Sequence, residues 1–397
     1  MLPLLHVSWR GVRVDLEMRE QATIDYTIHE GMLVQDLYVA AGRVLDPHSP
    51  KQLIEYVYTE HKLKPISRLR KTTVGETKYT TTLDEEAIAE LLTRELPTQV
   101  REVLRLVLEI RGVHKVLATY LQAPLDKDNR LRCSYAITGA ETGRISSRET
   151  PLGTGTNLQN VPSGVARAMV VPDDGLVFVS ADLSQAEARV VAYLAHETRL
   201  IDVFQSGGDV HRRNAAAIFA RLEDTVTPEQ RYLAKRVVHA SHYGMGPQKF
   251  ARVAGLPRLQ AQALLNRYFS TYPRLKVWHL AVEDQLRRSR TLHTPLGWRR
   301  QFLGVWGDEL LREAYAFVPQ STVADILNDG LIAYEQERPG ETLLQIHDSL
   351  IVQVPPELVP RASEALQRCL TRPLQIDGQS CTIPVDVKVG DTWDSLH

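Results

Sequence analysis

Two apolar stretches of the chain each lead to an aspartate, and the sequence interpretation starts from them. Residues 176–179 are β-branched and aromatic, as in a buried strand, and Asp182 follows closely. Ser184 and Glu187 then have capping-box spacing, and apolar residues recur at the helical period. The pattern therefore predicts Asp182 between a strand and a helix, a position that presents its carboxylate to a cleft.

The second stretch, residues 343–354, predicts two strands joined by a tight turn with Asp348 at its tip. A single aspartate at a strand end most often forms a turn or caps a helix. Two carboxylates on adjoining strands are what a two-metal phosphoryl-transfer site requires, because cations about 3.5–4 Å apart share anionic ligands.

Most of the remaining chain has helical periodicity. Helices are expected from a start at 82–85 through residue 122 with a break near Pro97, over much of 196–305, and from Leu310 to Tyr334. The C-terminal residues 385–397 predict a closing strand and a short tail.

Two segments break the helical pattern. Residues 66–83, rich in Thr and Lys, are expected to form an exposed loop, and contact with a phosphate backbone is compatible with this. Residues 131–162 predict a strand near Cys133–Ile137 followed by turns, a segment type that is often functional.

A helix expected from Pro228 carries one polar stripe. Arg231, Lys235, His239 and Tyr243 recur every four residues and so lie along one oblique line. Such a stripe is usually a solvated face. This one contains little acid, however, and two cations a turn apart suit a triphosphate, with an aromatic ring further along for a base.

Composition narrows the class of protein. At 397 residues, with 43% hydrophobic and 24% charged residues, the chain is expected to form two or three globular domains without a membrane span. The net charge of −1 leans weakly against nucleic-acid binding but permits a locally basic cleft. Three cysteines without CxxC spacing argue against disulfides or a zinc site and favour a reducing, cytoplasmic setting, in a cell or in a virus-infected host.

Several ordered motifs resemble the polymerase domain of family A DNA polymerases, the bacterial DNA polymerase I type. TGRISS at 142–147 with NLQNVP at 157–162 resembles TGRLSS…NLQNIP, and DLSQAEAR at 182–189 resembles DYSQIELR. Residues 231–246 are similar to the R-x3-K-x7-YG helix, and QIHDSLIVQV at 345–354 is similar to VHDELVFEV. The resemblance extends over essentially the whole chain.

The resemblance implies an α+β right-hand fold with an antiparallel palm sheet, a helical thumb and helical fingers. The expected division is palm base 1–45, thumb 46–122, palm 123–195, fingers 196–305 and palm 306–397. It also implies a DNA-directed DNA polymerase of replication or repair. No proofreading is expected, since the chain leaves no room for an exonuclease domain.

The same resemblance implies the chemistry of the site. Asp182, Asp348 and the Leu183 carbonyl would bind two Mg²⁺ ions, which Mn²⁺ can replace, and Lys235 would be the general acid for pyrophosphate. The nucleotide-binding residues would be Arg231, Lys235, His211, His239, Tyr243, Glu187 and Gln185. Among these, Glu187 would be the steric gate against a 2′-hydroxyl.

The implied partners are primer-template DNA and deoxynucleoside triphosphates, with the chain acting as a monomer. The DNA-binding residues would be Arg144, Gln320, Arg312, His347, Asn160 and Gln159. Arg144 and Gln320 would contact minor-groove acceptors at the primer terminus, which all correct pairs share. Considered without the resemblance, Arg144 is more often simply a surface arginine.

Four positions depart from the family pattern, namely Leu183, His239, Ala316 and Ser349, and the segment from Ser147 to Asn157 is longer. We expect an active enzyme with altered fidelity or substrate tolerance. Two alternatives remain: a single-subunit RNA polymerase, which shares the R-x3-K-x7-YG helix, and a non-catalytic DNA-binding replication accessory.

Overall fold

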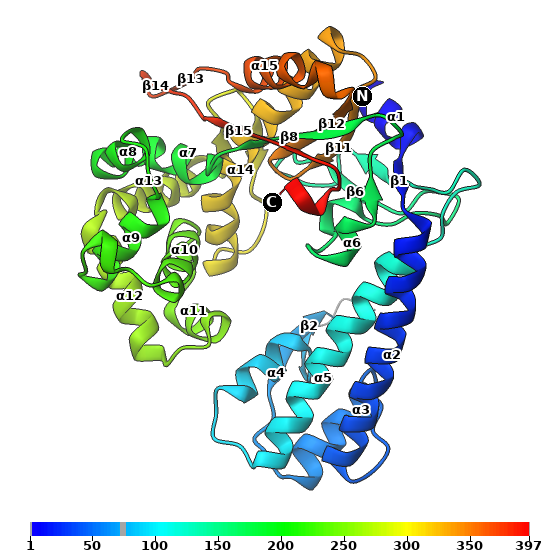
Figure 1. The fold of residues 1–397 in the computed structure, drawn as a ribbon. Coiled ribbons are helices and arrows are strands. Elements are labelled where there is room, and N and C mark those ends of the chain that lie inside the picture. The colour runs from blue at the N-terminus through cyan, green and yellow to red at the C-terminus, as the bar shows by residue number, and fades with distance from the viewer. Residues whose placement is uncertain (1, 72–76, 397) are drawn as a thin grey trace. The chain divides into compact units, whose positions relative to one another are not determined.

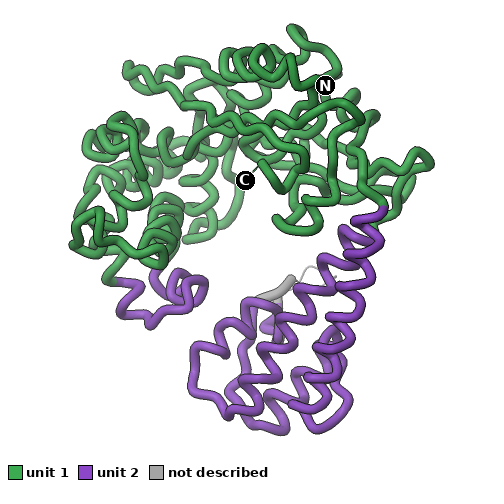
Figure 2. The backbone as a smooth tube through the Cα atoms, in the orientation of Figure 1, with its two compact units in different colours: residues 1–16, 123–246, 263–397 green, residues 17–122, 247–262 purple. Residues whose placement is uncertain are grey.

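The computed structural model describes residues 2–71 and 77–396. The chain divides into two compact units, each considered by itself (Figure 2). Unit 1 comprises residues 1–16, 123–246 and 263–397, and unit 2 comprises residues 17–122 and 247–262. No helix in the described part of the chain is both long and apolar enough to cross a membrane.

A four-stranded antiparallel sheet forms the centre of unit 1 (Figure 1). Its strands, in spatial order, are β11 (Thr342–Ile346), β12 (Ser349–Val354), β8 (Val177–Leu183) and β15 (Val385–Gly390). The two central strands are apolar and buried, as β-branched side chains between two layers should be. The predicted strand–turn–strand around Asp348, the strand before Asp182 and the closing strand are confirmed.

Two helices cover this sheet. Helix α15 (Val359–Leu370) contacts β8 and β15, and α14 (Asp308–Glu337) packs against α15. Gly330 permits this approach, since a Cβ there would lie 2.4 Å from Leu370 Cδ2. The helix predicted from Leu310 to Tyr334 is therefore present and longer at both ends.

Smaller elements complete the sheet region of unit 1. A three-stranded sheet has the order β4-β1-β7, and β5 and β6 form a separate pair. The elements are α1 (Leu2–Arg10), β1 (Val12–Val14), β4 (Arg130–Leu131), β5 (Ser134–Ala136), β6 (Ser146–Arg148), η3 (Leu158–Asn160), α6 (Val165–Ala168), β7 (Val170–Val171), η5 (Pro356–Leu358), β13 (Leu374–Ile376), β14 (Gln379–Cys381) and η6 (Asp394–Leu396).

The rest of unit 1 is mainly a group of helices, as the helical periodicity of residues 196–305 predicts. They are α7 (Ala186–Leu194), α8 (Thr198–Gln205), α9 (Val210–Phe219), η4 (Glu223–Thr225), α10 (Pro228–His242), α12 (Arg258–Thr271) and α13 (Arg274–Ser289), followed by β9 (Thr291–His293) and β10 (Arg299–Gln301). Helix α12 begins in unit 2 and continues into unit 1. Helix α10 starts with a full capping box between Thr227 and Gln230, with Pro228 in its first turn.

Unit 2 is mainly helical. Its elements are α2 (Leu16–Ala41), α3 (Pro50–Ile54), the π-helical turn η1 (Glu55–Glu60), β2 (Ser67–Lys71), β3 (Thr77–Thr81), α4 (Glu85–Leu92), α5 (Thr98–Val116), the π-helical turn η2 (Leu117–Leu121) and α11 (Pro247–Ala254). The break near Pro97 and the helix start at Asp84, which caps α4 from its side chain, are confirmed.

The structural boundary near the N-terminus differs from the expected one. Leu33, Leu37 and Ala41 of α2 belong to the same buried core as Leu53 and Val107. Residues 17–45 therefore pack with residues 46–122, and the unit boundary falls after residue 16 rather than residue 45.

The segment expected to be a loop at 66–83 instead contains a β-hairpin. Strands β2 and β3 pair antiparallel, with Ser67 opposite Thr81 and Arg68 opposite Thr80. The polar sequence gives no alternation of apolar residues, because the hairpin is not a layer of the main sheet. Residues 72–76 of the predicted loop lie outside the described residues.

Candidate active site

The two predicted aspartates lie on neighbouring strands of the central sheet. Asp182 is in β8, directly opposite Ser349 of β12, and Asp348 immediately precedes that serine in the β11–β12 turn. The backbone N–H of Leu183 donates to the carbonyl of Asp348 at 3.0 Å. His347 adopts a left-handed conformation with φ of 47°, which makes the tight turn possible. The backbone therefore fixes the two carboxylates at one edge of the sheet.

A third carboxylate adds to the charge at this edge. Asp386 of β15 lies opposite Asp182 on its other side. Removal from water raises the pKa of Asp182 to about 6, and the negative charges of Asp348 and Asp386 act in the same direction, while Lys388 opposes them. Concentrated negative charge and carboxylate oxygens are the environment that a hard divalent cation such as Mg²⁺ prefers.

Both aspartates line a hollow of about 580 Å³ in unit 1. Most of the predicted site residues line the same hollow: Arg144, Asp182, Leu183, Gln185, Glu187, His211, Lys235, His239, Tyr243, His347 and Asp348. The other predicted residues are outside its lining: Arg231, Gln320, Arg312, Asn160 and Gln159. Residues separated by more than 200 positions in the sequence are thus brought to one place by the sheet and by helices α7, α9 and α10.

Arg144 contacts two of the carboxylates that line the hollow. Its guanidinium donates to the carboxylate of Glu187 and, through Nη2 at 3.3 Å, to Asp348 Oδ1. Gln320 of α14 is hydrogen-bonded to the same glutamate. Burial nevertheless raises the pKa of Glu187 to about 7, because desolvation outweighs the opposing charge of Arg144.

Of Arg231 and Lys235 on α10, Lys235 alone lines the hollow, and the two residues differ in their partners. Arg231 Nε donates to Asp209 Oδ2, and this aspartate also caps α9. The sequence expectation of a stripe with little acid is therefore incomplete, because the acid comes from the start of another helix. Among the residues that the structure describes, none forms an ion pair with Lys235.

Two histidines of the site are held in surroundings that favour the neutral ring. Burial lowers the pKa of His211, and the positive charges of Lys235 and Arg231 lower it further. Burial also lowers the pKa of His239, with Arg144 as the next cause. The His239 ring contacts Tyr243 edge-on, with the ring centroids 4.8 Å apart. A neutral imidazole retains both a hydrogen-bond donor and an acceptor for a ligand.

The helix after Asp182 begins in a way that the sequence did not predict. Gln185, rather than Ser184, is the N-cap of α7, and it has a left-handed backbone with φ of 52°. The backbone N–H of Ser184 donates to the carbonyl of Pro384, so the predicted capping box is not formed. The Oε1 atom of Gln185 is buried and has no hydrogen-bond partner among the residues that the structure describes. A strained residue with an unused acceptor is typical of a functional turn.

Gln159 has an internal position in the structure. Its side-chain amide donates to Ile145 O at 3.0 Å and to Gln345 Oε1 at 2.7 Å, and it is 6% exposed. Gln345 in turn donates to the carbonyl of His347 at 3.0 Å. In the structure Gln159 thus supports the β11–β12 turn, and its expected DNA contact stays a prediction. Asn160, next in the chain, is exposed.

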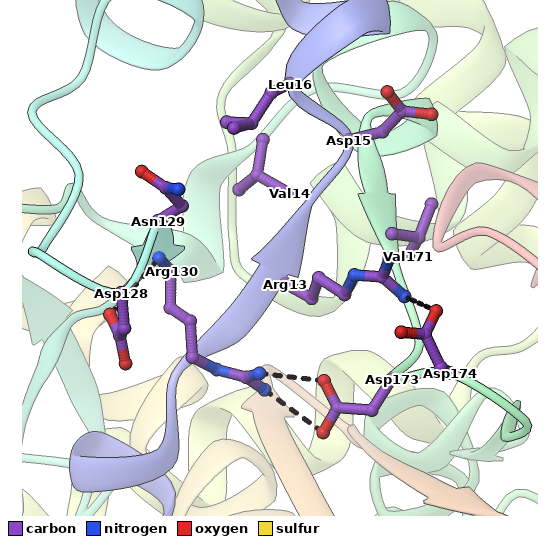
Figure 3. A pocket seen from close by; sticks show the side chains of 10 residues that line it. All are labelled: Arg13, Val14, Asp15, Leu16, Asp128, Asn129, Arg130, Val171, Asp173 and Asp174. Atoms are coloured by element: carbon purple, nitrogen blue, oxygen red, sulfur yellow. Dashed lines mark hydrogen bonds and ion pairs between the residues drawn. The ribbon is translucent and has the colours of Figure 1, made fainter.

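A second hollow of about 630 Å³ in unit 1 contains none of the predicted site residues (Figure 3). Arg130 forms a two-bond pair with Asp173, and Arg13 pairs with Asp174. Figure 3 shows both guanidinium groups pointing at these carboxylates. Each arginine is thus neutralised by its neighbour, and the pairs connect β1, β4 and the segment after β7.

The comparison with protein families identifies the family of the chain. The model of DNA polymerase family A matches residues 17–395. The chain belongs to DNA polymerase family A. Residues 182–189 and 345–354, which bring the carboxylates together, fall within the matched region.

Individual relatives agree with the family assignment. The chain is 30% identical to DNA polymerase I of Pseudomonas aeruginosa over 92% of its own length and 40% of the relative's. It is 28% identical to the thermostable DNA polymerase I of Thermus filiformis, over 99% of this chain and 47% of the relative. The chain thus spans about half the length of these family A relatives.

A solved family A structure has the same fold. It is the POL domain of Pol1 from M. smegmatis in complex with DNA primer-template and dNTP, with a TM-score of 0.84 and 26% identity. The match covers 100% of this chain and 70% of that one. The α+β fold expected from the sequence is confirmed.

Sequence reasoning missed two residues that shape this family A site. Asp386 contributes negative charge, and only the register of β15 against β8 reveals it. Asn328 of α14 donates to the carbonyl of Gly143 at 3.4 Å and so anchors the backbone next to Arg144. Neither residue has a local sequence signal, because both act through elements that are distant in the chain.

Proposed function

We propose that this chain extends the 3′-end of a DNA primer on a DNA template, using deoxynucleoside triphosphates and releasing pyrophosphate. The observation that carries the proposal is that Asp182, Asp348, Lys235 and His211 all line the same hollow. Family membership supports it, since the named relatives are DNA polymerases.

The carboxylates of Asp182 and Asp348 and the carbonyl of Leu183 would hold two Mg²⁺ ions. When bound, these ions promote ionisation of the primer 3′-hydroxyl and neutralise charge on the triphosphate and the departing pyrophosphate. The raised pKa of Asp182 supports this assignment, because a bound cation would relieve the repulsion among the carboxylates.

Residues of α9 and α10 act on the phosphates. The ammonium of Lys235 contacts the triphosphate and transfers a proton from Nζ to the leaving pyrophosphate oxygen. His211 donates a hydrogen bond to a phosphate oxygen. Its buried Nδ1 has no partner in the described part of the chain, which leaves capacity for one more bond. Arg231 adds a second positive charge once its pairing with Asp209 loosens.

Arg144, Glu187 and Gln320 act on the sugar and the primer terminus. Glu187 fills the space that a 2′-hydroxyl would need, and its bond to Arg144 holds it there. Arg144 Nε is buried and has no partner within residues 2–71 and 77–396, which leaves a donor for a minor-groove acceptor. Tyr243, with His239 against its ring, is placed for stacking on a base.

We further propose that this chain extends primers without proofreading. A 3′–5′ exonuclease by a two-metal mechanism needs its own set of carboxylates. The carboxylates that the structure gathers at the edge of the central sheet, Asp182, Asp348 and Asp386, are the set already assigned to primer extension.

Primer extension tests the proposed activity. The full chain is given a DNA primer-template, Mg²⁺ and either deoxynucleotides or ribonucleotides, beside Asp182→Ala and Asp348→Ala. We expect extension with deoxynucleotides but not with ribonucleotides. Each of the two aspartate variants should lose this extension activity. The matched control is Asp174→Ala, a highly exposed aspartate of the second hollow, which should extend at the wild-type rate.

The other outcomes separate the alternatives. Extension with ribonucleotides would favour an RNA polymerase or an ineffective Glu187 gate. DNA binding without extension would favour the accessory protein. Loss of activity in Asp174→Ala as well would mean that the aspartate variants report on folding rather than on chemistry.

A further inference from the structure

A cluster of two histidines and a glutamate lies in unit 2, outside the proposed active site. Glu30 of α2, His48 of the turn before α3 and His114 of α5 each offer a ligand atom, and these atoms lie within 4.8 Å of one another. His114 Nδ1 is 2.8 Å from Glu30 Oε1, and the rings of His48 and His114 have their centroids 4.5 Å apart. Three distant segments of the chain thus direct metal-ligating groups to one point.

The turn that carries His48 is fixed on both sides. The backbone N–H of His48 donates to Asp46 Oδ1 at 2.8 Å, and Ser49 caps α3 from its side chain. Arg111 Nε donates to the carbonyl of Pro47 at 2.8 Å. Since Arg111 and His114 are both in α5, the same helix holds the turn and supplies the second imidazole. The position of His48 relative to His114 is therefore built into the fold.

The chemistry of the three groups selects the type of ion. Two imidazole nitrogens and one carboxylate oxygen suit Zn²⁺ and similar transition metals, whereas Mg²⁺ prefers oxygen ligands alone. Around Zn²⁺, ligands at about 2.0–2.2 Å in tetrahedral geometry are roughly 3.4 Å from one another, so small side-chain rotations would close the cluster. The absence of CxxC spacing argues only against a zinc site with cysteine ligands, and the three groups of this cluster include no cysteine.

We propose that Glu30, His48 and His114 bind one Zn²⁺-type ion, with water in the fourth position. The ion joins α2, the turn before α3 and α5, and so links the two long helices of unit 2 through one point. Because a metal ion that binds only the folded state stabilises that state, the bound ion stabilises the fold of unit 2. The site is independent of the proposed function, since none of its ligands lines the proposed active-site hollow.

Zinc titration of the metal-free full chain tests the site. The protein carries Asp182→Asn and Asp348→Asn, so that those carboxylates cannot bind zinc, and excess Mg²⁺ is present throughout. Competition with a chromogenic chelator measures the affinity, and Co²⁺ reports tetrahedral coordination by its visible absorption. One equivalent should bind, and His48→Gln, His114→Gln and Glu30→Gln should each weaken binding at least tenfold.

His29→Gln is the matched control, because His29 is an exposed neighbour of Glu30 on α2 and is not in the cluster. It should bind zinc as the parent does. Zinc should also raise the unfolding temperature of the parent and of His29→Gln, but not that of His48→Gln. Equal zinc affinity in the parent, His48→Gln and His114→Gln would overturn the proposal, as would the absence of a tetrahedral Co²⁺ spectrum in the parent.

Discussion

At the scale of single residues, the environment separates two basic side chains that the sequence presents as equivalent. Arg231 and Lys235 lie one turn apart on α10, yet Asp209 holds the guanidinium of Arg231. The Arg231 side chain also interacts electrostatically with His211, whose pKa it lowers. Release of Arg231 toward a nucleotide therefore costs the ion pair with Asp209.

Asp209→Asn should improve nucleotide binding. The asparagine still caps α9, where Asp209 accepts the backbone N–H of Arg212, but it no longer holds Arg231 by charge. We expect the KM for deoxynucleotides to fall by up to roughly fivefold, equivalent to about 1 kcal/mol for a partly exposed ion pair. Steady-state primer extension measures this.

A double-mutant cycle with Arg231→Ala supplies the control. Arg231→Ala alone should raise the KM, and Asp209→Asn should have no further effect in that background. An equal fall in KM with and without Arg231 would show that Asp209 acts through something else.

At the scale of elements, the end of α10 depends on a glycine. Gly244 has φ of 64°, and a Cβ there would lie 2.7 Å from the ring of Tyr315 in α14. That ring is stacked on His279 at a centroid distance of 4.0 Å, and the Tyr315 hydroxyl donates to Glu283 Oε1 at 2.8 Å, so the side chain has little freedom to move. The glycine thus lets α10 end against α14 and places Tyr243 at the hollow.

Gly244→Ala should destabilise the fold by about 1–3 kcal/mol, through the left-handed backbone and the contact with Tyr315. Urea unfolding measures the loss. Gly246→Ala is the matched control two residues on, because nothing lies within 4 Å of a Cβ there. If both variants lost the same stability, a general preference for glycine in this turn would explain the result instead.

The buried face of α10 gives the protein a predictable response to acid. His242 is 3% exposed, its Nε2 lies 2.9 Å from the hydroxyl of Tyr268, and burial lowers its pKa to about 3. Between the unfolded pKa of about 6.5 and the folded value, only the unfolded chain takes up the proton. Stability should therefore fall as the pH drops below about 6.5.

His242→Gln should reduce this acid sensitivity. Between about pH 7 and about pH 5, the wild type should lose on the order of 2 kcal/mol more unfolding free energy than the variant. Denaturant unfolding at both values gives the difference, and the exposed His29→Gln should behave as the wild type. An identical loss in wild type and His242→Gln would mean that other groups control acid unfolding.

At the scale of the whole molecule, local patterns predicted the elements better than their assembly. The strand ends at Asp182 and Asp348 and the capped start of α10 followed from periodicity and capping residues, which act within a few positions. The burial of Gln159 and the charge of Asp386 depend on pairing between distant strands, which no local pattern encodes. The unit boundary was misplaced for the same reason, since α2 looks independent until its partners are known.

The same long-range assembly makes the site a source of instability in the metal-free protein. Asp182, Asp348 and Asp386 are brought together by the sheet, and the raised pKa of Asp182 reflects first its desolvation and then repulsion by the other two carboxylates. Near neutral pH, a charged Asp182 with a folded pKa above its unfolded value destabilises the folded state. A functional site of this kind trades stability for activity.

Asp182→Asn should therefore stabilise the metal-free chain while abolishing primer extension. Because Asp182 is partly exposed, solvent screening reduces the expected gain to about 1 kcal/mol. Urea unfolding in a chelator, near neutral pH, measures it, and the gain should shrink as the pH falls toward about 4, where the wild-type carboxyl becomes protonated in both states. Asp174→Asn, which removes a carboxylate of the second hollow already paired with Arg13, should give no such gain. Equal or lower stability of Asp182→Asn would show that the charged carboxylate of Asp182 does not destabilise the metal-free fold.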